Sequence, residues 1–444
     1  MAYTHTTFAT LRTRLSQRLG DENKVFWVDT ELGLYLIEAL RMWGALTAYW
    51  RERGVFPTVQ GTAFYDLGSL LSNGAALLLS RTLTDRQMIQ LMQYHLLEDA
   101  SSQVAWNGTD MFNLDDLRFF LQYRRNQFLF DTGIVLTRSA QNMPAPPIGR
   151  VQLPDTIIDV RRVNWIDSSG GNYVLWREDE YNFTAFAVAW DSNPGTPSVY
   201  SVAAVKPLEL QVNPPPIVSG TMELIAVQTG ADLDPANGVT ALGIPDDWCW
   251  AVKWGAISDL LAAPGLPYDP FRMAIAEQMY DLGVKAAKQL PVVITAQLNG
   301  INTQPAAIFD VDAYLGTNWQ DTQTMPTIVG AAGNLVVIAG LADGVYSITL
   351  DVVRKAPVPT VDEDYIQIGR EYLDTILDMA QWLAAFKQGG SEITAIQPLF
   401  DSFMAEAKRY NAHLSAAVRD WSVMAGQSHR EESYVPRELT PTGG

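Results

Sequence analysis

The chain has 444 residues, of which 48% are hydrophobic and only 18% charged, and its formal net charge is −18. This length allows two or three domains with a large core, and the acidic balance excludes an outer surface built to grip phosphates, which needs clustered lysine and arginine. An acidic wall is compatible with a pore through which DNA slides without sticking. The surplus of aromatic residues, including 13 tryptophans, predicts an obligate oligomer.

Cysteine content and the N-terminal sequence predict the compartment. Cys249 is the single cysteine, so an intramolecular disulfide is excluded. Residues 1–5 lack the charged and apolar regions of a signal peptide, and no apolar run approaches the length of a membrane span. We therefore expect a protein that is cytoplasmic when made and has no membrane partner.

Residues 1–141 are expected to form an N-terminal helical region. One apolar stripe, four and three residues apart, predicts a long helix that Asp29 caps and that ends at Gly54. Thr84 and Gln87 have the form of a capping box, and Asn113 is placed to cap a later helix. The stripe consists of Leu32, Leu36, Ala39, Trp43, Leu46 and Trp50.

Residues 142–243 are expected to form a β module. The stretch from Asn142 to Pro154 is rich in proline, which indicates a boundary. Short β-rich runs follow, separated by turn sequences at the spacing of a small antiparallel sheet. The runs are 157–160, 173–176, 199–205, 208–212 and 222–227.

Residues 244–290 are predicted to form a helical hairpin. Pro245-Asp246-Asp247 opens the first helix, with an aspartate placed to accept backbone N–H bonds. Pro264-Gly265 ends it, and Asp269-Pro270 begins the second helix with proline at the first helical position. The apolar stripes are Trp250, Trp254, Ile257 and Leu261, then Met273, Ala276, Tyr280, Val284 and Ala287.

The rest of the chain repeats this alternation. A second β module is expected over 291–357, with its best strands at 335–338 and 345–352 joined by a turn at Asp343-Gly344. C-terminal helices over 358–425 share a face that runs from Tyr365 to Leu383, and 426–444 is expected to be an extended arm. The predicted fold class is α+β, a mainly helical body (a helical bundle) with two inserted small antiparallel β modules.

The standard signatures of catalysis are missing from the sequence. It contains no phosphate loop, dinucleotide fingerprint or nucleophile elbow. With four histidines and one cysteine, a zinc site would depend on carboxylates, and His95 on an apolar stripe is expected to be a packed histidine. We therefore predict no catalytic, cofactor or metal site, and no enzyme.

Acidic pairs leave one catalytic alternative open. Asp232-x-Asp234 matches a calcium loop only in part, and both it and Asp310-x-Asp312 are better interpreted as turns. Glu178-Asp179-Glu180 could face Asp155 or Asp191 in the way that glycosidases require. Paired carboxylates are too common for this to carry weight.

The aromatic stripes supply the candidate interface residues. Aromatic side chains at helical spacing are most often core residues, but their density together with the low charge favours a subunit interface. The interface candidates are Trp43, Trp50, Trp250, Trp254 and Tyr280. Five arginines would contact nucleic acid if they lined one surface, although a dispersed, solvated set is the simpler interpretation. They are Arg41, Arg51, Arg53, Arg124 and Arg125.

Three segments resemble the bacteriophage head-to-tail connector (adaptor) proteins of the virion neck. The first runs from Phe8–Arg12 through Phe26-Trp27 to Glu38–Trp43, the second from Ile244-Pro245-Asp246 to Glu277–Tyr280, and the third from Ile366–Glu371 to Gly389-Gly390 and Ala407–Asn411. The two β modules depart from the pattern of these smaller adaptors.

The resemblance implies a non-enzymatic virion structural protein that assembles in the host cytoplasm. It implies a homo-oligomeric ring, commonly dodecameric, below the portal protein and joined to tail or nozzle proteins, with non-specific DNA passing through the lumen. Alternatives are another tail, collar or baseplate component, a virion-associated glycan hydrolase, and a cellular binding module.

Overall fold

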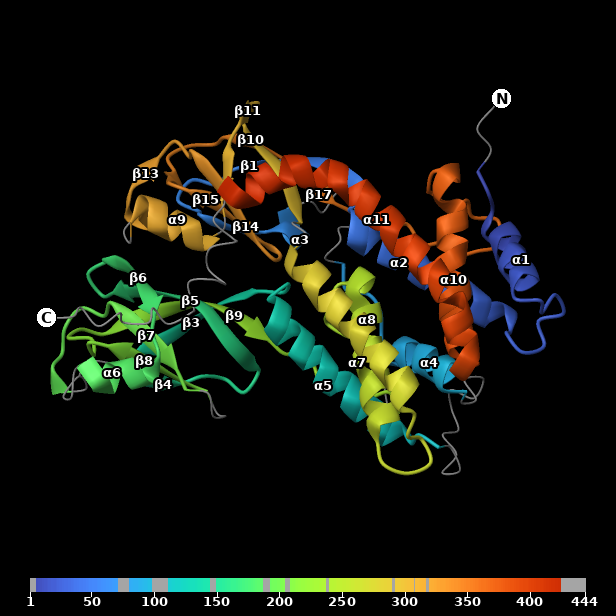
Figure 1. The fold of residues 1–444 in the computed structure, drawn as a ribbon. Coiled ribbons are helices and arrows are strands. Elements are labelled where there is room, and N and C mark those ends of the chain that lie inside the picture. The colour runs from blue at the N-terminus through green and yellow to red at the C-terminus, as the bar shows by residue number, and fades with distance from the viewer. Residues whose placement is uncertain are drawn as a thin grey trace, which may run out of the picture.

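The computed structural model describes residues 5–70, 80–97, 111–143, 149–186, 192–203, 208–236, 239–289, 292–306, 308–316 and 319–424. Figure 1 shows a helical body on the right, a β-rich part at the lower left and a second β-rich part at the upper left. The C-terminal arm expected over 426–444 lies outside the described residues.

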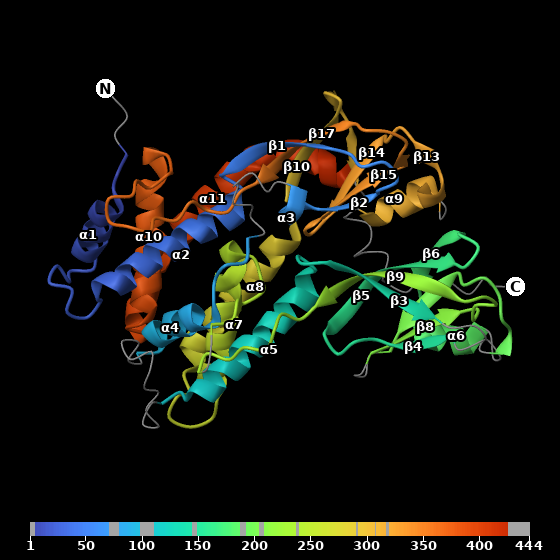
Figure 2. The ribbon, with the colours of Figure 1, turned by 180° about the vertical axis from the view of Figure 1, so that it is seen from behind.

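Eight helices build the body, and they come from the two ends and the middle of the chain. They are α1 (Phe8–Arg18), α2 (Asp29–Thr47), α4 (Asp85–Leu96), α5 (Leu114–Thr132), α7 (Cys249–Ala262), α8 (Pro270–Gln289), α10 (Leu373–Phe386) and α11 (Gly390–Met424). The hairpin of α7 and α8 packs against α5, while α10 packs against both α2 and α11, which also contact each other. Figure 2 shows α4, α5, α7 and α8 side by side from behind. Short 3-10 turns η2 (Asp246–Trp248) and η4 (Arg370–Tyr372) precede α7 and α10.

The lower β-rich part is one seven-stranded sheet, nearly closed on itself, which we call the barrel-like sheet. Its strands are β3 (Thr137–Met143), β4 (Arg150–Gln152), β5 (Ile157–Asp167), β6 (Asn172–Arg177), β7 (Val199–Val202), β8 (Glu209–Asn213) and β9 (Gly220–Gln228), with α6 (Glu180–Phe186) between β6 and β7. The spatial order is β3-β9-β5-β6-β7-β8-β4, and neighbours are antiparallel except β6 and β7. Its interior is a hydrophobic cluster of its own.

The upper β-rich part, called here the second β unit, combines two distant stretches of chain. One sheet has the order β1-β17-β10-β11 and another has the order β12-β14-β15-β2. The bounds are β1 (Arg51–Pro57), β2 (Phe64–Asp66), β10 (Val293–Leu298), β11 (Ile301–Asn302), β12 (Gln304–Ala306), β13 (Gln323–Thr324), β14 (Ile328–Ala332), β15 (Leu335–Ala339), β16 (Leu341–Ala342) and β17 (Ser347–Val353), with α3 (Leu67–Leu70), α9 (Ile308–Leu315) and η3 (Trp319–Asp321). Most of its buried apolar residues belong to the same cluster as the helices, whereas Ile294 and Val353 form a small separate cluster with Ala48.

The predicted fold class is wrong in its proportions. Helices hold 43% and strands 26% of the structure, and the barrel-like sheet is neither small nor a minor insertion in a helical bundle. The local β runs of 157–227 were recognised, but β3 and β4 were not. A sheet closes through pairings between distant residues, which alternation within one strand does not reveal.

The segment after α2 is also different from the prediction. The helix ends at Thr47, where Ala48 adopts a left-handed backbone conformation, and the chain then enters β1. Strand β1 is antiparallel to β17, with Arg51 opposite Val353. Trp50 therefore lies beyond the helix that its spacing predicted, because pairing with a strand nearly 300 residues away overrides the local pattern.

Two further boundaries need correction. Strands β15 and β17 belong to different sheets, so Asp343-Gly344 does not join a simple hairpin. The C-terminal helix begins at Leu373 rather than near Tyr365. By contrast, the turn of the α7–α8 hairpin lies where it was predicted, between Ala262 and Pro270. Helix α7 itself begins at Cys249, after the 3-10 turn η2, and not at the predicted Pro245-Asp246-Asp247.

Some of the predicted helix caps are confirmed and others are wrong. The capping box of Thr84 and Gln87 and the Asn113 cap are confirmed. The predicted Asp29 cap is wrong. Asp29 is the first residue of α2, the cap residue is Val28, and no side chain makes a capping hydrogen bond at this end of the helix. Asp246 also caps nothing, because its carboxylate binds another segment.

Candidate assembly surface and buried joints

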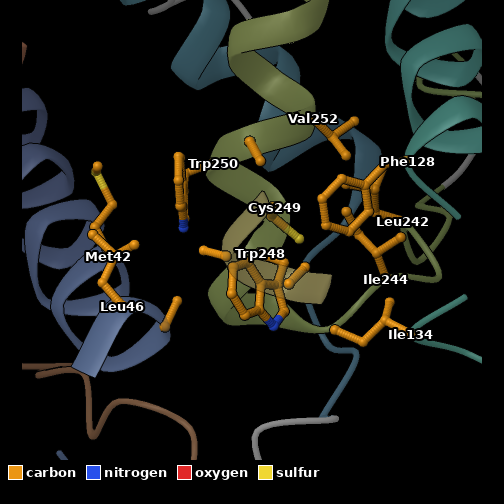
Figure 3. Packing of buried hydrophobic residues seen from close by; sticks show 14 of the residues in the cluster. Met42, Leu46, Phe128, Ile134, Leu242, Ile244, Trp248, Cys249, Trp250 and Val252 are labelled. Carbon is orange, nitrogen blue, oxygen red and sulfur yellow. The ribbon is translucent and has the colours of Figure 1, made fainter. Parts of the chain in front are cut away.

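Four of the five candidate interface residues lie inside the monomer. Trp43, Trp250, Trp254 and Tyr280 are buried, and Trp50 is half-buried with its indole N–H donating to the carbonyl oxygen of Gln367 at 2.7 Å. Figure 3 shows Trp250 on the side of α7 that faces α2. These aromatic surfaces are therefore covered by the same chain.

The centre of the body contains a buried charge network. Lys253 of α7 donates to both carboxylate oxygens of Glu38 in α2, at 2.6 and 2.5 Å, and to His95 Nε2 in α4 at 2.8 Å. Trp254 Nε1 donates to Glu38 at 3.0 Å. Burial lowers the pKa of Lys253, and burial also holds the pKa of His95 well below its usual range. Because all four side chains are buried, the network joins three helices and offers no access to a substrate.

Arg124 joins the hairpin to α5. Its guanidinium makes bonds of 2.6 to 3.0 Å with Asp259 of α7 and Glu277 of α8, and lies 4.8 Å from the ring centroid of Tyr280. Arg125 is buried and donates to the carbonyl oxygen of Ala231 at 2.7 Å. These two arginines hold the fold together and line no surface for nucleic acid.

We call such buried polar contacts between elements joints. A second joint lies where η2 meets the residues that follow β17. Asp246 accepts bonds from the backbone N–H groups of Thr82 and Leu83, and Asp247 accepts one from that of Ala356 at 2.7 Å. The other oxygen of Asp247 is buried and has no hydrogen-bond partner among the described residues. Burial raises the pKa of Asp247 to about 7.

The pH dependence of stability should report the burial of the Asp247 carboxylate. Because the folded-state pKa of Asp247 lies above its unfolded value, the stability it contributes is full below about pH 4 and is lost as the pH rises to about 7. We expect Asp247→Asn to match the wild type near pH 4 and to exceed it by on the order of 2–4 kcal/mol at pH 8. Urea unfolding from pH 4 to 8 measures this difference, and parallel curves for the two proteins would contradict it.

A third joint fixes the barrel-like sheet to the second β unit. Arg162 of β5 makes a bidentate ion pair with Asp312 of α9, at 2.7 and 2.9 Å, and both side chains are almost fully buried. Trp319 Nε1 also donates to Asp312 at 2.8 Å. The turn interpretation of Asp310-x-Asp312 missed this role, since nothing near Asp312 in the sequence points to Arg162.

The other predicted carboxylates differ in their contacts. Asp179 forms a local turn, accepting a bond from the Tyr181 backbone N–H at 2.8 Å. Asp232 accepts a bond from the side chain of Gln122 in α5 at 2.9 Å, a contact across 110 residues. Asp191 lies outside the described residues, as does the Glu180 side chain. Within the described chain, no group of three or more histidine, cysteine or acidic side chains is placed to hold a metal ion.

The hairpin turn and the first half of α5 expose a set of large apolar side chains, which we call the apolar end. Its members are Phe119, Tyr123, Leu266, Tyr268 and Phe271, each between 47% and 91% exposed. The rings of Phe119 and Tyr123 are stacked, one helical turn apart. Figures 1 and 2 both show the α7–α8 turn and the start of α5 at the lowest point of the molecule. This surface was not predicted, because the apolar residues of each helix were interpreted as one inward-facing stripe.

Comparison of the sequence with protein families and with curated sequences adds no relative. No protein-family model matches this chain, and no curated protein sequence matches it either. Among the described helices, none combines the length and apolarity that crossing a membrane requires.

Proposed function

We propose that this protein is a non-enzymatic structural subunit of a tailed-phage virion, a head-to-tail connector that forms a ring below the portal. DNA would pass through the lumen of the ring, and tail or nozzle proteins would bind its other side. The observation that carries the proposal is the α7–α8 hairpin, which sits in the helical body and ends in exposed apolar side chains.

The packing of the hairpin suits a rigid part of an assembly. Helices α7 and α8 approach so closely that a Cβ added to Gly283 would lie 2.2 Å from the Cβ of Ala251. The Arg124 ion pairs and the Lys253 network then fix the hairpin to α5, α2 and α4. A preorganised subunit loses less conformational freedom when it joins a ring, which favours assembly.

The acidic charge is also compatible with the proposal. A net charge of −18 repels the phosphate backbone, so DNA could move through an acidic lumen without being held. In the described chain, Arg124, Arg125 and Arg162 serve internal contacts, so they are not available to DNA.

Native mass spectrometry of the purified chain, alone and mixed with the portal protein of the same phage, tests the proposal. We expect a closed ring, either alone or on addition of the portal, whose mass gives the number of copies. A chain that remains a monomer and ignores the portal would rule the proposal out.

The barrel-like sheet supports a second candidate, a collar or baseplate component. It has its own hydrophobic cluster, which is typical of an appended binding unit. Ring formation without portal binding, together with binding to a tail or fibre protein, would favour this candidate.

A further inference from the structure

Helix α5 is apolar on two opposite faces. Leu117, Leu121 and Phe128 are buried against the body, whereas Phe119 and Tyr123 point outward. Phe119 and Tyr123 lie among exposed polar residues of the same helix, such as Asp115 and Arg118. No element of the described chain covers this pair of aromatic rings.

The apolar end is large enough to matter in assembly. Aromatic side chains bury about 150–250 Å² each, so five large side chains that are half exposed present roughly 500 Å². This lies within the range of about 300–600 Å² found for the largest apolar patch of a monomeric protein, a patch that often has a function. It is also more than half of the roughly 800 Å² that each partner contributes to a stable protein interface.

The charges around the apolar end indicate what kind of partner surface covers the apolar end. The arginines beside the apolar end are already paired: Arg118 with Asp115 at 3.5 Å, Arg124 with Asp259, and Arg272 with Asp269 at 2.6 Å. Among the described residues, the end therefore offers no unpaired arginine to an acidic ligand such as DNA. Two copies with a net charge of −18 each repel one another, and contact between them costs least where apolar side chains and paired charges dominate.

The shape of the turn is fixed before any partner binds. Pro264, Pro267 and Pro270 restrict the backbone, and the Asp269 N–H donates to the carbonyl oxygen of Leu261 at 3.0 Å. Leu266 and Tyr268 are thus presented outward by a restrained loop. Little conformational entropy remains to be lost when they are buried.

We propose that the apolar end is the surface through which one copy of this chain contacts a second copy. This inference rests on the proposed ring function and names the contact that closes the ring. In such a ring each copy inserts the α7–α8 turn and the outer face of α5 against its neighbour, which buries Phe119 and Leu266.

The test uses two double variants. The apolar-end variant carries both Phe119→Ser and Leu266→Ser, and the matched control carries both Val55→Ser and Val345→Ser. The control residues are exposed apolar side chains on the second β unit. All four side chains are exposed, so thermal unfolding of the monomer should barely change. Native mass spectrometry over a concentration series measures assembly, and hydrogen exchange at 117–124 and 262–271 measures burial.

We expect the apolar-end variant to need at least tenfold more protein to assemble than the wild type and the control. Hydrogen exchange in both segments should slow when the wild type assembles. An apolar-end variant that forms the wild-type ring at the wild-type concentration overturns the inference and leaves the ring function standing. An intact ring that has lost only portal binding also overturns it, and assigns the surface to the portal. A wild type that forms another oligomer, which the variant disrupts, supports the contact and removes the ring function.

Discussion

Replacing Lys253 with methionine is expected to destabilise the protein by about 3–5 kcal/mol, because it leaves the Glu38 carboxylate buried without a cation. In the wild type both oxygens of Glu38 accept from Lys253 Nζ, and Trp254 supplies one further bond. Methionine fills a similar volume but donates no hydrogen bond, so most of the loss comes from the unpaired charge. Denaturant unfolding followed by tryptophan fluorescence measures it.

Two variants show whether charge pairing is the cause. Lys285→Met on the exposed face of α8 makes the same substitution outside the network and should change stability by less than about 0.5 kcal/mol. Adding Glu38→Gln to Lys253→Met removes the orphan charge and should recover part of the loss. A Lys253→Met protein as stable as the Lys285→Met control would contradict the interpretation.

Replacing Arg162 with methionine is expected to cost a similar amount, about 3–5 kcal/mol, but at a different place in the molecule. The substitution leaves Asp312 with the Trp319 indole as its remaining described partner. Since the pair joins β5 to α9, the contact between the barrel-like sheet and the second β unit should open first. We expect hydrogen exchange to accelerate in β5 and α9 before it accelerates in the helices of the body.

The matched control is Arg150→Met, on a half-exposed arginine of the same sheet. We expect it to leave exchange at β5 and α9 unchanged. The double variant Arg162→Met with Asp312→Leu should regain stability, because an apolar pair of similar volume replaces the ion pair. If the single and double variants were equally unstable, shape rather than charge would determine this joint.

Local sequence was sufficient for the features that depend on neighbouring residues. The turn between α7 and α8, the Thr84 capping box and the Asn113 cap follow from contacts within four residues. The strands between 157 and 227 could also be recognised, because alternation is a property of each strand alone. Their pairing order could not, since β3 pairs with β9 across about 80 residues.

Where a prediction from the sequence was wrong, a residue distant in the chain determined the structure. The apolar stripe from Leu32 to Trp50 has helical spacing, yet β17 draws residues 51–57 into a sheet. Asp246 looks like a helix cap, yet the N–H groups of Thr82 and Leu83 occupy its carboxylate. Asp312 looks like a turn residue in the sequence, yet in the folded chain it makes a buried ion pair with Arg162. By itself, the sequence determined helix ends and strand alternation, whose energies come from neighbouring residues. The tertiary structure alone decided which strands pair, which charges are buried together and which apolar faces stay exposed, because those energies depend on residues brought together only by folding.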